Sequence, residues 1–287
     1  MSRPPLILAL LLALTSGLGV SGVEVEAATG PPDVPGLVEL AGREAFVLYT
    51  PGSLDRASRV QDWLETLGDE YAGVTGERVR LGAYLLDRRE WESADLGAPY
   101  GFPRSAGRGR TVLPAFGDQG TVTLWRRYQP EGLPAPGGSP VRGTPEEAAS
   151  LFTADLWGLF ETARGLVLRG PVRGEDPWID ELMAHALAVQ ALERRNPRRA
   201  ASFDRFWSHL GRAAMDSVSR GGTEASETFD RWVAHQSRLH ELARSMADRE
   251  GRRGGVFSRL WRLGRKSDGI LTEDGLRRRY RDSVPLP

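Results

Sequence analysis

The sequence predicts an α+β protein, with a small mixed sheet and one helix in its N-terminal half and helices throughout its C-terminal half. Short apolar runs predict strands between residues 37 and 128, whereas apolar residues recur every three to four positions from residue 144 onward. The 287 residues include 40% hydrophobic residues, 38 basic and 38 acidic side chains, as in ordinary globular proteins. Because the formal net charge is zero, we predict no nucleic-acid partner.

Residues 1–28 predict a signal peptide, with an N-terminal membrane anchor as the alternative. Arg3 precedes an apolar segment at residues 6–14, and small residues follow it. This segment is shorter than the roughly 20 residues that a membrane span needs, so we expect cleavage after Gly22 or Ala27. The chain contains no cysteine, which excludes disulfides and thiol catalysis. We therefore expect an exported protein, periplasmic or extracellular; its single lysine, Lys266, among many arginines indicates a GC-rich bacterial genome.

The sheet half begins after a Pro/Gly-rich linker. The segments VEL and AFVLYT within residues 37–50 predict a β-hairpin around Ala41-Gly42. Ser53 is the expected N-cap of a helix that extends to about Tyr71. The remaining elements expected in this half are strands at residues 79–86, 111–116 and 121–128 and a short helix at residues 88–96.

Two loops interrupt this half of the chain. The first, at residues 100–110, is rich in glycine and proline and carries Arg104, Arg108 and Arg110. Guanidinium groups on such a loop can bind a carboxylate or a phosphate, although a solvated loop without a ligand is the simpler interpretation. The second, at residues 130–143, is long enough to indicate a lid or a mobile connection.

Two helices joined by a short turn follow at residues 151–193. Thr144, Pro145 and Glu147 predict a capping box with proline at the first helical position. Gly170-Pro171 ends this first helix. Asp176-Pro177 begins the second helix in the same manner, and Asn196-Pro197 ends it.

This pair of helices resembles the zinc-binding core of the gluzincin metallopeptidases, the peptidase MA-like group. In that family, H-E-x-x-H on one helix supplies two histidine ligands and a general-base glutamate, and P-W-x-x-E-G-x-A on a second helix supplies the third ligand. Here residues 160–164 read FETAR, and residues 177–184 read PWIDELMA. Glu161 thus matches the general base and Glu181 the third ligand. The resemblance covers these two helices closely and the rest of the chain only in layout.

The departures from the family pattern concern the metal. Phe160 and Arg164 stand where the two histidines belong, and Leu182 replaces the glycine. A phenyl ring cannot ligate zinc, and the fixed charge of a guanidinium repels a cation. The resemblance therefore implies a zincin-like α+β domain at residues 37–249 without zinc or another cofactor, in which Glu161 is vestigial. We expect Arg164 to pair with Glu161 and Glu181, and Arg164, Glu181 and His185 to line a binding cleft.

The implied function is that of a pseudoenzyme whose cleft binds an extended peptide or an envelope partner. In gluzincins the edge strand of the sheet lies over the cleft and pairs with such a peptide. One alternative is an active secreted hydrolase or peptidase, with zinc if other ligands replace the histidines, or with Glu161 and Glu181 as an acid–base pair. A further alternative is an unrelated helical domain in which Glu161 and Arg164 form an ordinary surface pair.

The histidines lie in the helical part of the chain. His185 follows Glu181 by four residues and shares its helix face, so a metal-ligand pair is one interpretation and a packed core histidine the other. His235 and His240 are five residues apart, which is wrong for one face. Helices are expected at residues 201–217 and 224–249, separated by Gly221-Gly222, with apolar stripes that belong to the core.

Residues 250–287 are expected to form a basic C-terminal tail. From Arg249 onward the chain carries 11 basic and 5 acidic residues, and residues 256–263 read VFSRLWRL, a short amphipathic segment. We interpret it as disordered or loosely docked, with weak contact to an anionic membrane surface or a partner groove. This tail gives the last alternative, a structural envelope protein that the tail tethers.

Overall fold

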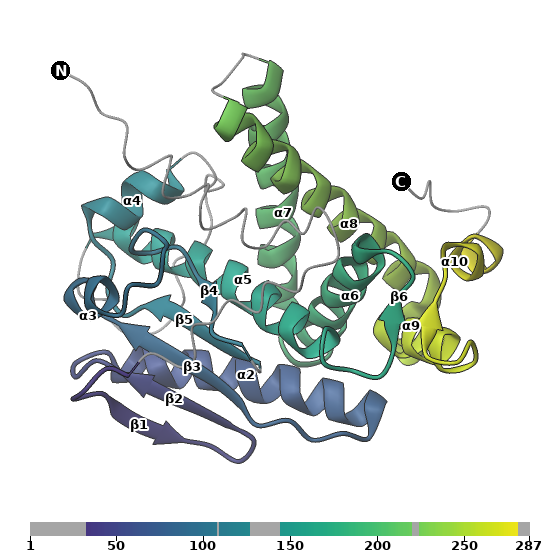
Figure 1. The fold of residues 1–287 in the computed structure, drawn as a ribbon, viewed down its shortest axis with the longest axis horizontal. Helices are drawn as coiled ribbons and strands as arrows, with labels where there is room; N and C mark the ends of the chain where they lie inside the picture. Colours follow the sequence, from purple (N-terminus) through teal and green to yellow (C-terminus); the bar gives the residue numbers. More distant parts are fainter. Residues whose placement is uncertain (1–32, 108, 127–143, 220–223, 281–287) are drawn as a thin grey trace.

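The computed structural model describes residues 33–107, 109–126, 144–219 and 224–280, which form the expected α+β arrangement (Figure 1). A mixed sheet occupies the N-terminal half, and helices follow it. The predicted signal peptide at residues 1–28, the loop at residues 130–143, Arg108 and Gly221-Gly222 lie outside the described residues. Among the helices that are described, none has the length and apolar character required to cross a membrane.

The five-stranded sheet has the order β1-β2-β3-β5-β4. Its strands are β1 (Val38–Ala41), β2 (Ala45–Tyr49), β3 (Leu81–Leu86), β4 (Arg104–Ser105) and β5 (Arg110–Pro114). The inner strands β2, β3 and β5 are parallel, whereas the edge strands β1 and β4 run antiparallel to their neighbours. The predicted hairpin is confirmed: the Gly42 amide donates to the Ala45 carbonyl at 2.7 Å across its turn.

The sheet is covered on both faces. Helices α2 (Leu54–Thr75) and α5 (Pro145–Val167) contact one face, where Leu81, Ala83 and Leu85 of β3 enter the main core. Tyr84 and Leu86 enter a smaller apolar cluster, which also contains Trp91 of α3 (Arg88–Ser93). Every residue of β3 is buried, which explains its uninterrupted apolar sequence.

The strand predicted at residues 121–128 is wrong, because its described part belongs to helix α4 (Gln119–Trp125). Asp118 and Thr121 form a capping box: the Asp118 carboxylate accepts from the Thr121 amide at 2.8 Å, and the Thr121 hydroxyl oxygen accepts from the Asp118 amide at 2.9 Å. The Trp125 ring is buried and stacks on Phe102, with centroids 5.7 Å apart. The capping box and the burial of Trp125 against Phe102 together outweigh the β propensity of Thr and Val.

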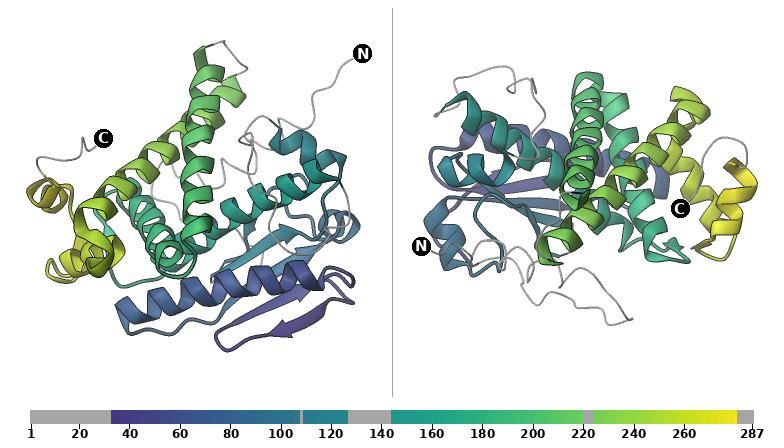
Figure 2. Two further views of the ribbon diagram at one scale, coloured as in Figure 1. Left: turned by 180° about the vertical axis from the view of Figure 1, so that it is seen from behind. Right: turned by 90° about the horizontal axis from the view of Figure 1, so that it is seen from above.

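The helical half contains α6 (Pro177–Arg195), α7 (Pro197–Ser219) and α8 (Glu224–Gly254). Helices α7 and α8 form a hairpin that extends away from the sheet (Figures 1 and 2). The capping box predicted for α5 is confirmed by hydrogen bonds between Thr144 and Glu147 in both directions. Asn196 ends α6, as expected, and α7 begins at the next residue.

The described residues after 255 pack into the main core rather than forming a loose tail. They make α9 (Val256–Arg265), β7 (Ile270–Leu271) and α10 (Glu273–Tyr280), and β7 pairs in parallel with β6 (Arg173–Gly174). Phe257 and Trp261 of α9 both contact the ring of Tyr71 in α2, with centroids 6.2 Å away. The boundary expected near residue 249 therefore does not coincide with an edge of the hydrophobic core. Amphipathicity alone cannot tell a core-facing helix from a membrane-facing one.

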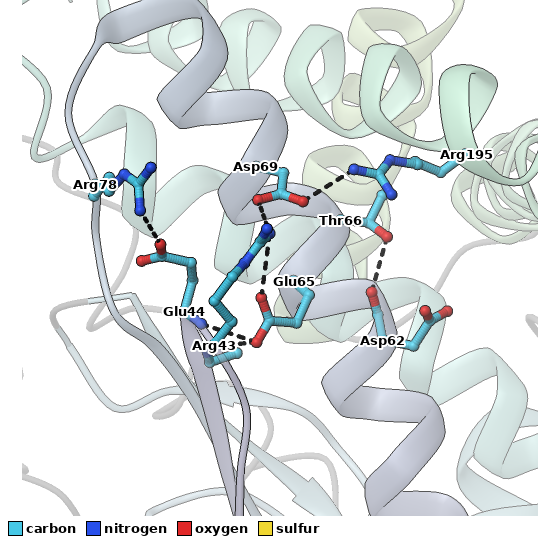
Figure 3. A network of polar contacts seen from close by, with 9 residues as sticks. Arg43, Glu44, Asp62, Glu65, Thr66, Asp69, Arg78 and Arg195 are labelled. Atoms are coloured by element: carbon cyan, nitrogen blue, oxygen red, sulfur yellow. Dashed lines mark hydrogen bonds and ion pairs between the residues drawn. The ribbon is translucent and has the colours of Figure 1, made fainter.

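A surface network joins the β1–β2 hairpin to α2 and α6 (Figure 3). Asp69 of α2 pairs with Arg43 and, at 3.0 Å, with Arg195 of α6. Glu65 accepts hydrogen bonds from the amides of Glu44 and Ala45 at 2.9 and 3.0 Å. Exposed ion pairs of this kind contribute only about 0–1 kcal/mol each, so the network mainly fixes the orientation of the hairpin.

Candidate functional site

Glu161 and Arg164 of α5 form the ion pair expected from their sequence spacing. Arg164 Nη1 lies 3.9 Å from Glu161 Oε2, at the long limit of such a contact. The side chains are 13% and 26% exposed for Glu161 and Arg164, respectively, so the pair lies at the edge of the core rather than in free solvent. The guanidinium is therefore only loosely neutralised by its own helix.

Glu181 of α6 pairs with a residue that the sequence did not indicate. Its Oε2 lies 3.7 Å from Nε2 of His235 in α8, and the carboxylate side chain is 14% exposed. The expected ion pair between Glu181 and Arg164 is not found among the described residues, which corrects that prediction. Helix α8 provides a nearer partner for Glu181. The sequence holds no local signal for this contact, because α6 and α8 are separated by the whole of α7.

Arg104 of the edge strand β4 completes the cluster. Burial lowers the pKa of Arg104, and the Glu161 carboxylate acts in the opposite direction. Burial also raises the pKa of Glu161; Arg164 and Arg104 oppose that rise, whereas Glu181 adds to it. The structure thus gathers two guanidiniums and two carboxylates, from β4, α5 and α6. Of the loop arginines that the structure describes, Arg104 reaches this site, whereas Arg110 lies over the Phe46 ring.

One donor in this cluster is unused. Arg164 Nε is buried and, within the described part of the chain, has no hydrogen-bond partner. A buried donor without a partner costs about 1–3 kcal/mol. Arg164 therefore has an uncommitted donor and a weak ion pair in the same side chain.

Phe160 and His185 belong to the hydrophobic core. Both are 0% exposed, and their rings stack with centroids 4.4 Å apart. His185 Nε2 lies 3.1 Å from Gln236 Oε1 of α8. The expectation that His185 lines the cleft is wrong, because α6 is buried on almost every face and turns this residue toward α7 and α8.

The residues at the family's zinc positions do not fit zinc. Phe160 offers no ligating atom, and the Arg164 guanidinium lies beside the Glu161 carboxylate that would approach a metal-bound water. Glu181 offers carboxylate oxygens, and Nε2 of His235 lies 3.7 Å from its Oε2. Within residues 33–280, as far as they are described, no group of three His, Cys, Asp or Glu side chains is arranged to hold a metal ion.

Two buried histidines make the stability of the fold depend on pH. The rings of His185 and His240 lie 5.5 Å apart, and both are buried. Burial lowers the pKa of His185 well below its usual value, and a positive charge on His240 or His235 would lower it further. Burial also lowers the pKa of His240, although Asp204, 3.0 Å from its Nε2, opposes that shift. Both rings are thus held neutral in the folded state.

We expect the free energy of unfolding to fall as the pH falls below about 6.5, the ordinary pKa of histidine. In that range the histidines bind protons in the unfolded chain but not in the folded chain. Each histidine therefore contributes up to about 1.4 kcal/mol per pH unit to the slope of the free energy of unfolding. Above this range the contribution is constant. Urea unfolding between pH 8 and pH 5 measures the slope, which His185→Gln is expected to reduce. The matched control is His209→Gln, a partly buried histidine of α7; equal slopes for the wild type and His185→Gln contradict the expectation.

Comparisons with family models, curated proteins and solved structures found no match to this chain. The gluzincin resemblance thus stays an interpretation of residues 160–164 and 177–184. The arrangement that carries a functional argument is the charged cluster of Arg104, Glu161, Arg164 and Glu181.

Proposed function

We propose that this protein is an exported, non-catalytic module with a zincin-like architecture, which binds an extended peptide beside β4. The observation that carries the proposal is the position of Arg104. It stands on an antiparallel edge strand that packs against α5, and the Glu161 carboxylate of α5 opposes the fall in its pKa that burial causes. A peptide that pairs with such an edge brings its own polar groups next to the charged cluster.

The layout of the sheet supports this proposal. An edge strand offers unpaired backbone N–H and C=O groups, which extended peptides use for recognition. Strand β4 pairs with β5 through Arg104 and Ser105, and α5 packs against both strands. The order of strand, helix and strands followed by paired helices is also the layout that the gluzincin resemblance implies.

The chemistry of the cluster supports binding rather than catalysis. The Arg164 guanidinium lies 3.9 Å from the Glu161 carboxylate and lowers its basicity, against the effect of burial. Arg164 places a permanent cation where the family has a neutral ligand. Such a cluster is suited to holding polar or charged groups of a ligand in a fixed position.

The test is retention of random heptapeptides, with free and with amidated C-termini, on the immobilised protein, quantified by mass spectrometry. We expect retention by the wild type and a loss of roughly 10–100-fold in affinity for Arg164→Ala, since a charged hydrogen bond contributes about 1.5–3 kcal/mol. The matched control is Arg212→Ala, an exposed arginine of α7, which should retain peptides as the wild type does.

Two outcomes contradict this proposal. The absence of any retained peptide removes the binding function. Cleavage of the peptides by the wild type, lost in Glu161→Gln, supports instead the hydrolase that uses Glu161 and Glu181. Thermal unfolding of each variant shows whether a loss of binding reflects a loss of fold.

A further inference from the structure

We infer that the charged cluster recognises the C-terminal carboxylate of the bound peptide, which Arg164 and Arg104 hold together. This inference rests on the proposed peptide-binding function and specifies which group of the peptide is recognised. Its chemical basis is the pair of guanidiniums supplied by two different elements, the strand β4 and the helix α5.

The donors of Arg164 favour a carboxylate ligand. The guanidinium presents its donors in a planar fork, which matches the two oxygens of a carboxylate. In the structure its ion pair to Glu161 is 3.9 Å long, and its Nε has no hydrogen-bond partner among the described residues. The side chain retains 26% exposure, so part of it is accessible to a ligand. A bound carboxylate would replace the weak pair with a closer contact to the guanidinium.

Glu161 and Glu181 leave the Arg164 guanidinium only weakly paired. Glu181 already lies 3.7 Å from His235, a partner outside the guanidinium pair. Glu161 is the other carboxylate beside Arg164, and its Oε2 lies 3.9 Å from Arg164 Nη1. Two cations shared by one carboxylate give a charge-assisted contact on two sides.

The shape of the edge strand favours the end of a peptide over its middle. Strand β4 consists of Arg104 and Ser105 alone, and the chain turns at Gly107 with φ 69°. A ladder on such a short strand pairs with only a few residues of the ligand. Arg104 is one of the two residues of that strand. The C-terminal carboxylate of a peptide that ends there therefore lies close to the Arg104 guanidinium. This places main-chain pairing and charge recognition at the same point.

The experiment compares one random heptapeptide mixture in two forms, with a free C-terminal carboxylate and with a C-terminal amide, both labelled with fluorescein at the N-terminus. Fluorescence anisotropy should show at least about 10-fold tighter binding of the acid form, as expected for a charged hydrogen bond. In Arg164→Ala and in Arg104→Ala that preference should disappear. Arg164→Lys keeps the charge without the planar fork and should retain part of the preference.

The outcomes separate this inference from the proposed function. Equal binding of acid and amide forms by the wild type overturns the carboxylate assignment and leaves peptide binding intact. Failure of both forms to bind overturns both. Amidated peptides that bind only when they contain glutamate or aspartate show recognition of a side-chain carboxylate and overturn the C-terminal assignment. Displacement by acetate as effective as displacement by peptide acid reduces the cluster to a small-carboxylate site and overturns it as well.

Discussion

Truncation after Arg249 is expected to unfold the protein rather than to release a folded core. The segment removed by this truncation fills the end of the main core between α2, α6 and α8. Its fully or nearly buried side chains are Val256, Phe257, Leu260, Trp261, Leu271, Leu276 and Tyr280. Glu250, which also leaves, binds Arg259 and Arg279 at 3.2 and 2.8 Å.

The expected loss of unfolding free energy is as large as the net stability of a whole domain. A fully buried apolar side chain contributes roughly 1.5–3 kcal/mol, so the seven side chains together amount to roughly 10–20 kcal/mol. A typical domain has a net stability of about 5–15 kcal/mol. The packing is also tight: a Cβ at Gly170 would stand 3.0 Å from the Trp261 ring. Removal of Phe257 would leave Tyr71 of α2 beside a cavity or on an exposed apolar surface.

Near-UV circular dichroism and urea unfolding of the fragment ending at Arg249 test this expectation. The matched control ends at Tyr280 and removes none of the described contacts. Trp261→Ala should cost about 3–5 kcal/mol, whereas its exposed neighbour Arg262→Ala should stay within about 0.5 kcal/mol. A cooperative unfolding transition in the shorter fragment contradicts the prediction.

Because the truncation is expected to unfold the core, the envelope-tether alternative needs a different test. Deleting the basic segment confounds loss of fold with loss of localisation. Substitution of the exposed Arg265, Lys266 and Arg278 by serine removes positive charge without touching the core. Mislocalisation of that variant, with unchanged thermal stability, supports the tether.

Local signals in the sequence predicted most elements. Thr144, Pro145 and Glu147 defined the start of α5, and the turn at Gly42 joined the strands of the first hairpin. Such signals act within a few residues and need no knowledge of the fold. The errors arose where tertiary packing decides. The segment at residues 119–125 has β-prone residues, yet the burial of Trp125 against Phe102 makes it a helix.

The candidate site was predictable only in part, for the same reason. Glu161 and Arg164 are three residues apart on one helix, so their contact follows from helical geometry. His235 and Arg104 reach the site from α8 and β4, and no periodicity connects them to α5. His185 failed as a cleft residue because an amphipathic pattern does not reveal that α6 is covered on nearly every face.

Asp155→Asn is expected to destabilise the protein far more than the loss of an aspartate at the surface. Asp155 of α5 binds Arg56 of α2 through both terminal guanidinium nitrogens, at 3.1 and 2.8 Å. Arg56 Nε donates to the Pro114 carbonyl of β5 at 2.8 Å, so one buried side chain joins two helices and the sheet. The side chains of Arg56 and Asp155 are 5% and 13% exposed, respectively. The two residues are 99 positions apart, and nothing in the sequence pattern pairs them.

The substitution leaves a cation in the core without its counter-charge. Loss of one partner from a buried ion pair costs about 3–5 kcal/mol, because the remaining charge keeps its desolvation penalty. Arg59 adds to the effect: burial lowers its pKa, and the Asp155 carboxylate is the leading opposing influence. Asparagine has nearly the same shape as aspartate, so the change tests charge and not packing.

Thermal unfolding should show a fall in Tm on the order of 10 °C, since 1 kcal/mol corresponds to about 2–4 °C in a domain of this size. The matched control is Asp69→Asn, which also removes an aspartate bound to two arginines, Arg43 and Arg195, but at the surface (Figure 3). Its cost should stay within about 1 kcal/mol. Replacing the buried pair by Arg56→Met with Asp155→Leu removes both charges and should recover much of the loss. A similar Tm for the two asparagine variants contradicts the assignment of Arg56 and Asp155 as the buried polar link between α2, α5 and the sheet.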